Sequence, residues 1–197
     1  MNRRTRFFRW FRVLPLLAVV IVGALSLAVG FAPKSLLRKY VFPITYREAI
    51  LDSSYRHGVD PRLVCAIITN ESGWDASAYS AAGAAGLMQV MPSTAETLVG
   101  LGYVDGWSYD ASNLLDPTTN IEYGVACIDF LDDNLGDTDQ VIAAYNAGIG
   151  TVQEWMSSGS VSVSDVIAYP ETRIYLVKVN ETYKIYQKLY DENLNDK

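Results

Sequence analysis

The sequence predicts an all-α fold preceded by one N-terminal transmembrane helix. Residues 13–32 form an uncharged, mostly apolar run that is long enough to span a bilayer as a helix. After this run, apolar residues recur at helical spacing, and several segments begin at Asp-Pro or end at Gly, which are signals of helix boundaries. No set of segments alternates between apolar and polar residues as strands do, so an α-rich domain is favoured.

Charge on either side of the apolar run predicts how the chain is oriented. All basic residues before the run are arginines, and no acidic residue precedes Glu48: Arg3, Arg4, Arg6, Arg9 and Arg12. Basic residues stay in the cytoplasm, so the C-terminal part is expected outside, anchored by a single pass in the cell membrane. We expect a cytoplasmic basic segment at 1–12, an anchor at 13–32, a linker at 33–45 and one extracytoplasmic domain at 46–197.

A cleaved signal peptide is the alternative interpretation of the same run. The apolar region of a signal peptide is about 7–15 residues long and ends at a small-x-small site. Ser26-Leu27-Ala28 would serve as such a site. The run is longer than that, which favours the retained anchor, and a buried core helix is the weakest alternative.

The remainder of the chain is acidic. The formal net charge is −6, but without the five N-terminal arginines 11 basic residues stand against 22 acidic ones. An acidic body repels phosphate backbones, which argues against nucleic acid as a partner. Half of the residues are apolar, so the domain can form a sizeable core.

Cysteine and histidine usage gives no sign of a metal site. Cys65 and Cys127 could pair outside the cell, or both could be buried thiols. Neither lies in a cluster of metal-binding residues, and His57 is the sole histidine. We therefore expect neither a metal nor another cofactor.

The first half of the domain contains three expected helices. Residues 46–57 are amphipathic and end at Gly58. Asp60-Pro61 opens a second helix that runs through Ser72, since aspartate is a good N-cap and proline a good first residue. A loop rich in small residues follows at 75–86, and a third helix begins at Pro92.

The second half contains two long expected helices. After a loop at 101–115, Asp116-Pro117 begins a helix whose apolar residues share one face: Ile121, Val125, Ile128 and Leu131. A short helix at 139–146 ends at Gly148, and a helical turn at 152–156 precedes a polar, β-prone loop at 159–164. The last helix covers 171–190 and carries the apolar residues Ile174, Val177, Tyr183, Ile185 and Tyr186.

Glu71 is the first candidate for chemistry. It lies near the end of an apolar helix, and apolar surroundings raise the pKa of a carboxyl group. Such a carboxylic acid can donate a proton to a glycosidic oxygen near neutral pH. Taken alone, this segment favours a glutamate that faces water at a helix end over a catalytic residue.

Three further segments combine polar side chains with helix signals. Residues 86–92 contain Gln89, whose amide can both donate and accept hydrogen bonds. Residues 144–148 contain Tyr145 and Asn146, and residues 170–175 place Glu171 at a helix start, where the dipole favours a carboxylate. Core packing and helix termination would explain each segment when taken alone.

In order and spacing, these four segments resemble the catalytic domain of the soluble lytic transglycosylases, a family related to goose-type lysozyme. The resemblance covers residues 46–190 and implies a lysozyme-like, α-rich fold. It implies that Glu71 is catalytic. It also implies substrate-binding residues: Ser80 for an N-acetyl group, Met88 and Gln89 along the saccharide groove, Tyr145 and Asn146 beside the catalytic acid, Glu171 in support of the groove, and Tyr175 near the catalytic carboxyl.

The resemblance also implies a reaction. Peptidoglycan glycan strands would be cut between N-acetylmuramic acid and N-acetylglucosamine, with Glu71 acting first as acid and then as base, and a 1,6-anhydro ring would form. A lysozyme-type hydrolase would add water instead, and Asp75 would be its second carboxylate, although the helix is expected to break at Gly73. A non-catalytic wall-binding module is a further alternative. Service in cell-wall, secretion, conjugation or sporulation machinery is compatible with the enzyme.

Overall fold

The computed structural model describes residues 13–23, 33–157 and 159–197. The chain divides into two compact units, and the division falls between Pro43 and Ile44.

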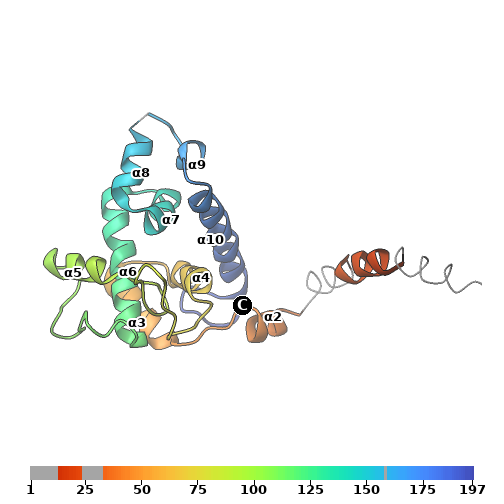
Figure 1. The fold of residues 1–197 in the computed structure, drawn as a ribbon. Helices are drawn as coiled ribbons and strands as arrows, with labels where there is room; N and C mark the ends of the chain where they lie inside the picture. Colours follow the sequence, from red (N-terminus) through yellow and green to blue (C-terminus); the bar gives the residue numbers. More distant parts are fainter. Residues whose placement is uncertain (1–12, 24–32, 158) are drawn as a thin grey trace, which may run out of the picture. The chain divides into compact units, whose positions relative to one another are not determined.

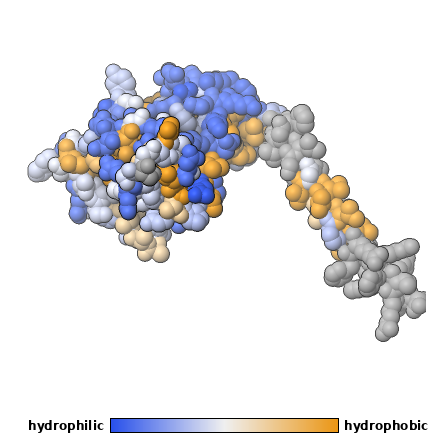
Figure 2. Space-filling view, turned by 90° about the horizontal axis from the view of Figure 1, so that it is seen from above, coloured by the Kyte–Doolittle hydropathy of each residue, from blue (hydrophilic) through white to orange (hydrophobic). Residues whose placement is uncertain are grey.

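In the first unit, residues 13–23 are helical and expose mostly apolar side chains, which Figure 2 shows in orange. The rest of the expected anchor, residues 24–32, and the basic segment 1–12 lie outside the described residues. Within the described ranges, no helix combines the length and the apolar character that crossing a membrane requires. The expected linker is not wholly irregular, because helix α2 (Lys34–Tyr40) lies within it.

The second unit is built from helices. Figure 1 shows them in chain order: α3 (Arg47–His57), α4 (Pro61–Glu71), α5 (Pro92–Gly100), α6 (Pro117–Leu135), α7 (Thr138–Ala147), α8 (Ile149–Met156), α9 (Val163–Val166) and α10 (Pro170–Leu189). Over the described ranges, β-structure is limited to isolated bridges such as Tyr79–Ala85 and Ala85–Val90. The expected α-rich fold is confirmed.

Helix α4 is the centre of the core. The expected N-cap is present, since the Asp60 carboxylate accepts a hydrogen bond of 2.8 Å from the backbone N–H of Arg62. Every residue from Val64 to Ile68 is fully buried. Burial on all sides is typical of a helix enclosed by others, and α4 packs against α3 and α10. The core therefore holds the C-terminal end of α4, where Glu71 lies.

Helix α6 is the second element of the core. Asp116 caps its first turn by accepting from the Thr119 N–H, and the expected apolar face is buried throughout. Helix α6 packs against α3, α5 and α7.

Two local features go beyond what the sequence indicated. On α10, Ile174 and Val177 are 56% and 59% exposed, whereas Tyr175, Val179 and Tyr186 are buried. The apolar residues noted on this helix in the sequence therefore do not all lie on its buried face. The expected loop at 159–164 is irregular as far as Ser162, and its last two residues belong to a helical turn, α9, that begins at Val163.

Candidate active site

Glu71 is the last residue of α4, and the chain turns sharply after it. Ser72 is the C-cap, and Gly73 has a φ of 61°, a left-handed conformation that glycine adopts without strain. The expected break at Gly73 is confirmed. Burial raises the pKa of the Glu71 carboxyl above its usual value, although a hydrogen bond from Tyr175 lowers it in part.

Tyr175, in the second turn of α10, contacts this carboxyl directly. Its phenol donates a hydrogen bond of 2.6 Å to Oε1 of Glu71. Burial and the nearby Glu71 carboxyl raise the pKa of Tyr175 well above its usual value, so the phenol stays protonated and acts as a donor. Tyr175 can therefore orient Glu71 and stabilise its ionised form.

The segment at 86–92 is joined to both neighbouring segments by hydrogen bonds. The Ser72 hydroxyl donates to the Leu87 carbonyl oxygen at 2.8 Å, which ties the end of α4 to this segment. The Tyr145 phenol, on α7, donates to the Met88 carbonyl oxygen at 2.9 Å. Burial raises the pKa of Tyr145 well above its usual value, so it too remains a neutral donor.

A further hydrogen bond joins α7 to α10. The buried Thr172 hydroxyl donates to Oδ1 of Asn146 at 2.8 Å. Together with the Tyr175–Glu71 contact, these bonds form a closed ring through all four segments singled out in the sequence. We refer to the four hydrogen bonds Ser72–Leu87, Tyr145–Met88, Thr172–Asn146 and Tyr175–Glu71 as the hydrogen-bond ring.

Asn120, on α6, fixes the position of the segment at 86–92. Its side chain is fully buried, accepts from the Met88 N–H at 2.7 Å, and donates to the carbonyl oxygens of Ala85 and Leu114 at 2.8 Å each. Gly86 has a φ of 74°, and a Cβ there would lie 2.5 Å from the Leu114 carbonyl oxygen. Glycine is thus required at this position by both backbone conformation and space.

Gln89 and Ser80 lie on the same loop. The Gln89 amide nitrogen donates to the carbonyl oxygens of Gly86 at 2.9 Å and Ala78 at 3.2 Å. These two acceptors fix the orientation of the amide and leave its oxygen as the atom that can accept from a ligand. The Ser80 hydroxyl accepts from the Ala84 N–H at 3.0 Å, and its own hydrogen remains for donation.

Met88 and Glu171, two of the expected binding residues, differ in exposure. Met88 is fully buried and packs against Gly124, so its side chain belongs to the core and does not line an open groove. Met91 is only partly buried and precedes α5. Glu171 is exposed in the first turn of α10, and its neighbour Thr172 makes the contact to Asn146.

The structure also shows where Asp75, the alternative second carboxylate, and the two cysteines lie. Asp75 is exposed and accepts hydrogen bonds from the backbone N–H and hydroxyl of Ser77, which lower its pKa. Cys65 and Cys127 are both free thiols, and burial raises the pKa of Cys127 to about 12. Within the described part of the chain, no group of three or more His, Cys, Asp or Glu side chains is arranged to hold a metal ion.

Open space adjoins Tyr145. A hollow of about 290 Å³ lies between α5, α6 and the start of α8, and its wall includes Tyr145, Thr94 and Gly148. A ligand in this hollow would contact Tyr145, which takes part in the hydrogen-bond ring. Sequence reasoning gave no role to Ser72, Asn120 or Thr172, because a single polar residue gives no sign of a partner far away in the chain.

Comparison with known families identifies this architecture. The family model of the Transglycosylase SLT domain matches residues 48–162. The chain belongs to this family. The matched range contains Glu71 and Tyr145 and ends before α10, which carries Tyr175.

Individual relatives agree with the family. The chain is 33% identical to the soluble lytic murein transglycosylase of Escherichia coli K12, over 70% of this chain and 22% of the relative. It is 33% identical to membrane-bound lytic murein transglycosylase C of Edwardsiella ictaluri, over 73% of this chain and 47% of the relative. The crystal structure of the 70 kDa soluble lytic transglycosylase of Escherichia coli superposes with a TM-score of 0.69 at 31% identity, covering 75% of this chain and 25% of that one. The chain thus spans less than half the length of these relatives.

Proposed function

We propose that this protein is a peptidoglycan lytic transglycosylase. It would cleave the β-1,4 bond between N-acetylmuramic acid and N-acetylglucosamine and leave a 1,6-anhydromuramic acid end. The hydrogen-bond ring is the observation that carries this proposal, because it gathers the four family segments around one carboxyl. The names of the relatives, which are murein transglycosylases, point to the same activity.

The first step needs a protonated Glu71. Burial raises its pKa, so a substantial acid fraction persists at higher pH than for an exposed glutamate. Glu71 donates its proton to the glycosidic oxygen, and the bond to the anomeric carbon breaks. The positive charge that develops on the sugar is stabilised by the substrate's own N-acetyl oxygen.

The second step uses Glu71 as a base. The carboxylate left by the first step accepts the proton of the C6 hydroxyl of muramic acid, and that oxygen attacks the anomeric carbon. The Tyr175 hydrogen bond stabilises the carboxylate between the two steps. One residue serves as both acid and base, so no second carboxylate is needed.

The substrate-binding residues follow from the atoms left available. The Gln89 amide oxygen accepts from a sugar N–H or hydroxyl, and the Ser80 hydroxyl donates to an N-acetyl oxygen. Tyr145 and Asn146 shape the groove beside Glu71, and Glu171 borders it at the start of α10.

A pair of matched variants tests the catalytic role. Purified Glu71→Gln protein should stay folded and lose release of fragments from purified peptidoglycan, whereas Asp75→Asn protein should keep the normal rate. Normal release by the Glu71→Gln variant would refute the proposal. Loss of release in the Asp75→Asn variant would favour the hydrolase with two carboxylates.

We also propose that residues 13–32 are retained as a membrane anchor and hold the catalytic domain outside the cell. The uncharged run and the arginines before it support this. Intact mass measurement of protein from isolated membranes tests it. Protein of full mass that only detergent extracts is expected, and a soluble product starting near Ala28 would overturn the anchor.

A further inference from the structure

Helix α2 of the first unit, labelled in Figure 1, exposes its apolar side chains. None of its seven residues, all of which the structure describes, is buried. Leu36 is 49% exposed and Tyr40 is 69% exposed, and Val41, the C-cap, is also exposed. Helices shorter than about 12 residues are marginal in water unless an apolar face packs against something. A surface that covers Leu36 and Tyr40 would therefore stabilise α2.

The side chains of α2 are sorted by polarity around the helix. Leu36 and Tyr40 are four residues apart and lie on one side, whereas Lys34 and Arg38 are four residues apart and lie on the opposite side. Lys39 borders the apolar side, and its ammonium group lies 5.1 Å from the centroid of the Tyr40 ring. An apolar side flanked by basic residues is typical of helices that lie in the surface of a membrane.

The position of α2 in the chain points to the same partner. Only Pro33 separates α2 from the uncharged run at 13–32, so a run held in the bilayer leaves α2 at the bilayer surface. The stretch is also basic, because no acidic residue precedes Glu48. Basic segments next to a membrane are attracted to anionic lipid headgroups. Tyrosine suits this boundary too, since its ring is apolar and its hydroxyl is polar.

A lipid surface fits α2 better than an anionic polymer of the cell wall does. Such a polymer would pair with the basic residues but leave Leu36 and Tyr40 in water, where exposed apolar area is unfavourable. A bilayer surface takes up both kinds of side chain. The apolar side enters the boundary of the acyl chains, while the lysine stems extend and bring their ammonium groups to the headgroups.

We propose that α2 is an interfacial helix that binds anionic phospholipid, with Leu36 and Tyr40 in the acyl boundary and Lys34 and Lys39 at the headgroup phosphates. The inference rests on the proposed membrane anchor, which brings α2 to the bilayer, and is independent of the chemistry at Glu71.

A bound α2 limits how far the catalytic domain can move from the membrane. The seven residue steps from Tyr40 to Arg47, where α3 begins, span at most about 25 Å when fully extended. Neutron reflectometry of full-length protein in a supported bilayer of phosphatidylglycerol measures this distance. The protein layer should begin within about 25 Å of the headgroups, and a wider gap would overturn the proposal.

Hydrogen exchange of the α2 amides tests the lipid contact itself. Full-length protein is placed in nanodiscs of phosphatidylglycerol or of phosphatidylcholine, and exchange is followed by mass spectrometry. The α2 amides should exchange roughly tenfold more slowly with phosphatidylglycerol, because anionic headgroups hold the basic helix in place. Lys34→Gln/Lys39→Gln should remove most of this difference, whereas Lys178→Gln, a change of an exposed lysine on α10, should leave it unchanged.

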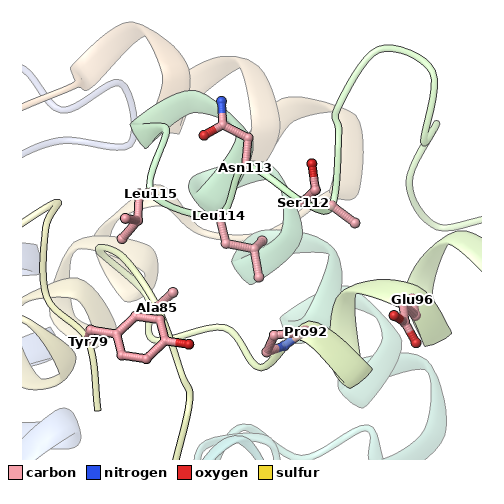
Figure 3. Close-up of a pocket in the computed structure, with 9 residues that line it drawn as sticks. Tyr79, Ala85, Pro92, Glu96, Ser112, Asn113, Leu114 and Leu115 are labelled. Atoms are coloured by element: carbon pink, nitrogen blue, oxygen red, sulfur yellow. The ribbon is translucent and has the colours of Figure 1, made fainter.

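A second pair of variants tests the apolar side. Leu36→Gln/Tyr40→Gln should make α2 exchange fast in both lipids, and glutamine forms helices about as well as leucine does, so the effect reports lost burial. The matched control is Leu115→Gln/Tyr79→Gln. Leu115 and Tyr79 are 49% and 69% exposed, the same fractions as Leu36 and Tyr40, but they line a pocket of the second unit (Figure 3). This control should not change exchange in α2.

Two results of the exchange measurement would overturn the proposal. One is equal exchange of the wild-type α2 amides in the two lipids. The other is slow exchange that survives in both α2 variants, which would mean that α2 packs against protein. The intact mass of the same sample shows whether residues 13–32 are present, so failure of the anchor is distinguished from failure of the α2 contact. Glu71→Gln protein should show wild-type exchange in α2, whatever its activity.

Discussion

Tyr175 donates a hydrogen bond of 2.6 Å to the carboxyl of Glu71, a residue 104 positions earlier in the chain. The contact joins the start of α10 to the end of α4, the most buried helix of the domain. Burial and this hydrogen bond act on the Glu71 carboxyl in opposite directions, since burial raises its pKa and the phenol lowers it. The balance suits a group that must both give and take a proton.

Replacing Tyr175 by phenylalanine should reveal both effects. We expect a loss of roughly tenfold in kcat/KM, equivalent to about 1.4 kcal/mol, because the carboxylate formed after proton donation loses one donor. The Glu71 pKa should rise, so the decline of activity at alkaline pH should move to higher pH. The pH–rate profile measures both changes. Tyr183→Phe is the control, since its phenol donates to Asp60 at the other end of α4; an equal effect of both variants would contradict the role of Tyr175.

Ionisation of Glu71 should lower the stability of the folded domain. Its folded-state pKa is raised, so its contribution to stability is fully present below the usual pKa of about 4.5 and is lost as pH rises through the raised value. Glutamine is neutral at every pH. The Glu71→Gln variant should therefore have a higher Tm than wild type at pH 8, and the difference should shrink at pH 4. A lower Tm of the variant at pH 8 would show that the ionised carboxyl is stabilised by its surroundings.

Gly86 should be intolerant of any side chain. Alanine there combines a left-handed backbone with a clash against the Leu114 carbonyl oxygen, and we expect a loss of about 3 kcal/mol in the free energy of unfolding. Gly136→Ala is the matched control, because Gly136 has a φ of 66° but nothing within 4 Å of the added Cβ. Urea unfolding of both variants measures the difference. Equal losses would mean that backbone strain alone matters at Gly86.

His57 should make stability depend on pH. Its ring nitrogens lie 3.2 Å from Glu122 and 2.8 Å from Asp129, both on α6, and Glu122 also accepts from Arg56. The hydrogen bond to Glu122, with that to Asp129, raises the His57 pKa despite burial. Burial opposes ionisation of Glu122, but the bonds from His57 and Arg56 outweigh it and lower the Glu122 pKa to about 2.

The raised pKa of His57 and the lowered pKa of Glu122 together define the pH range in which the protein should be most stable. The His57 contribution is fully present below its usual pKa of about 6.5 and is lost as pH rises through the raised value, while the Glu122 contribution is present above about 4.5 and is lost as pH falls toward about 2. Wild-type Tm should therefore be highest between about pH 4.5 and 6.5. The His57→Gln variant should lose stability most in that range. A Tm difference that does not change between pH 5 and 9 would contradict the charged state of His57.

Local signals made most of the fold predictable from the sequence. Asp60 and Asp116 accept the N-terminal hydrogen bonds of α4 and α6 as expected, because capping depends on a few neighbouring residues. The orientation of α10 was not predictable in the same way. Its exposed Ile174 and Val177 are as apolar as its buried residues, and which side faces the core depends on the packing of α4 and α7.

The candidate site, like the fold, was predictable from the sequence only in part. The four segments are recognisable in sequence, yet the bonds that connect them join residues far apart in the chain. Asn120 and Thr172 are polar residues within helices, and nothing adjacent to them indicates that one bridges two loop segments and the other holds Asn146. Met88 was misplaced for a related reason: its neighbour Gln89 is partly exposed, whereas Met88 turns inward against Gly124.

The mass of the reaction products tests the central claim most directly. Purified peptidoglycan digested with the wild-type protein should yield anhydromuropeptides, each one water lighter than the corresponding hydrolysis product, and the Glu71→Gln protein should yield neither. This result is predicted because the C6 hydroxyl of the substrate, and not water, attacks the anomeric carbon. Products that carry only reducing ends would contradict the account and identify a hydrolase on the same fold.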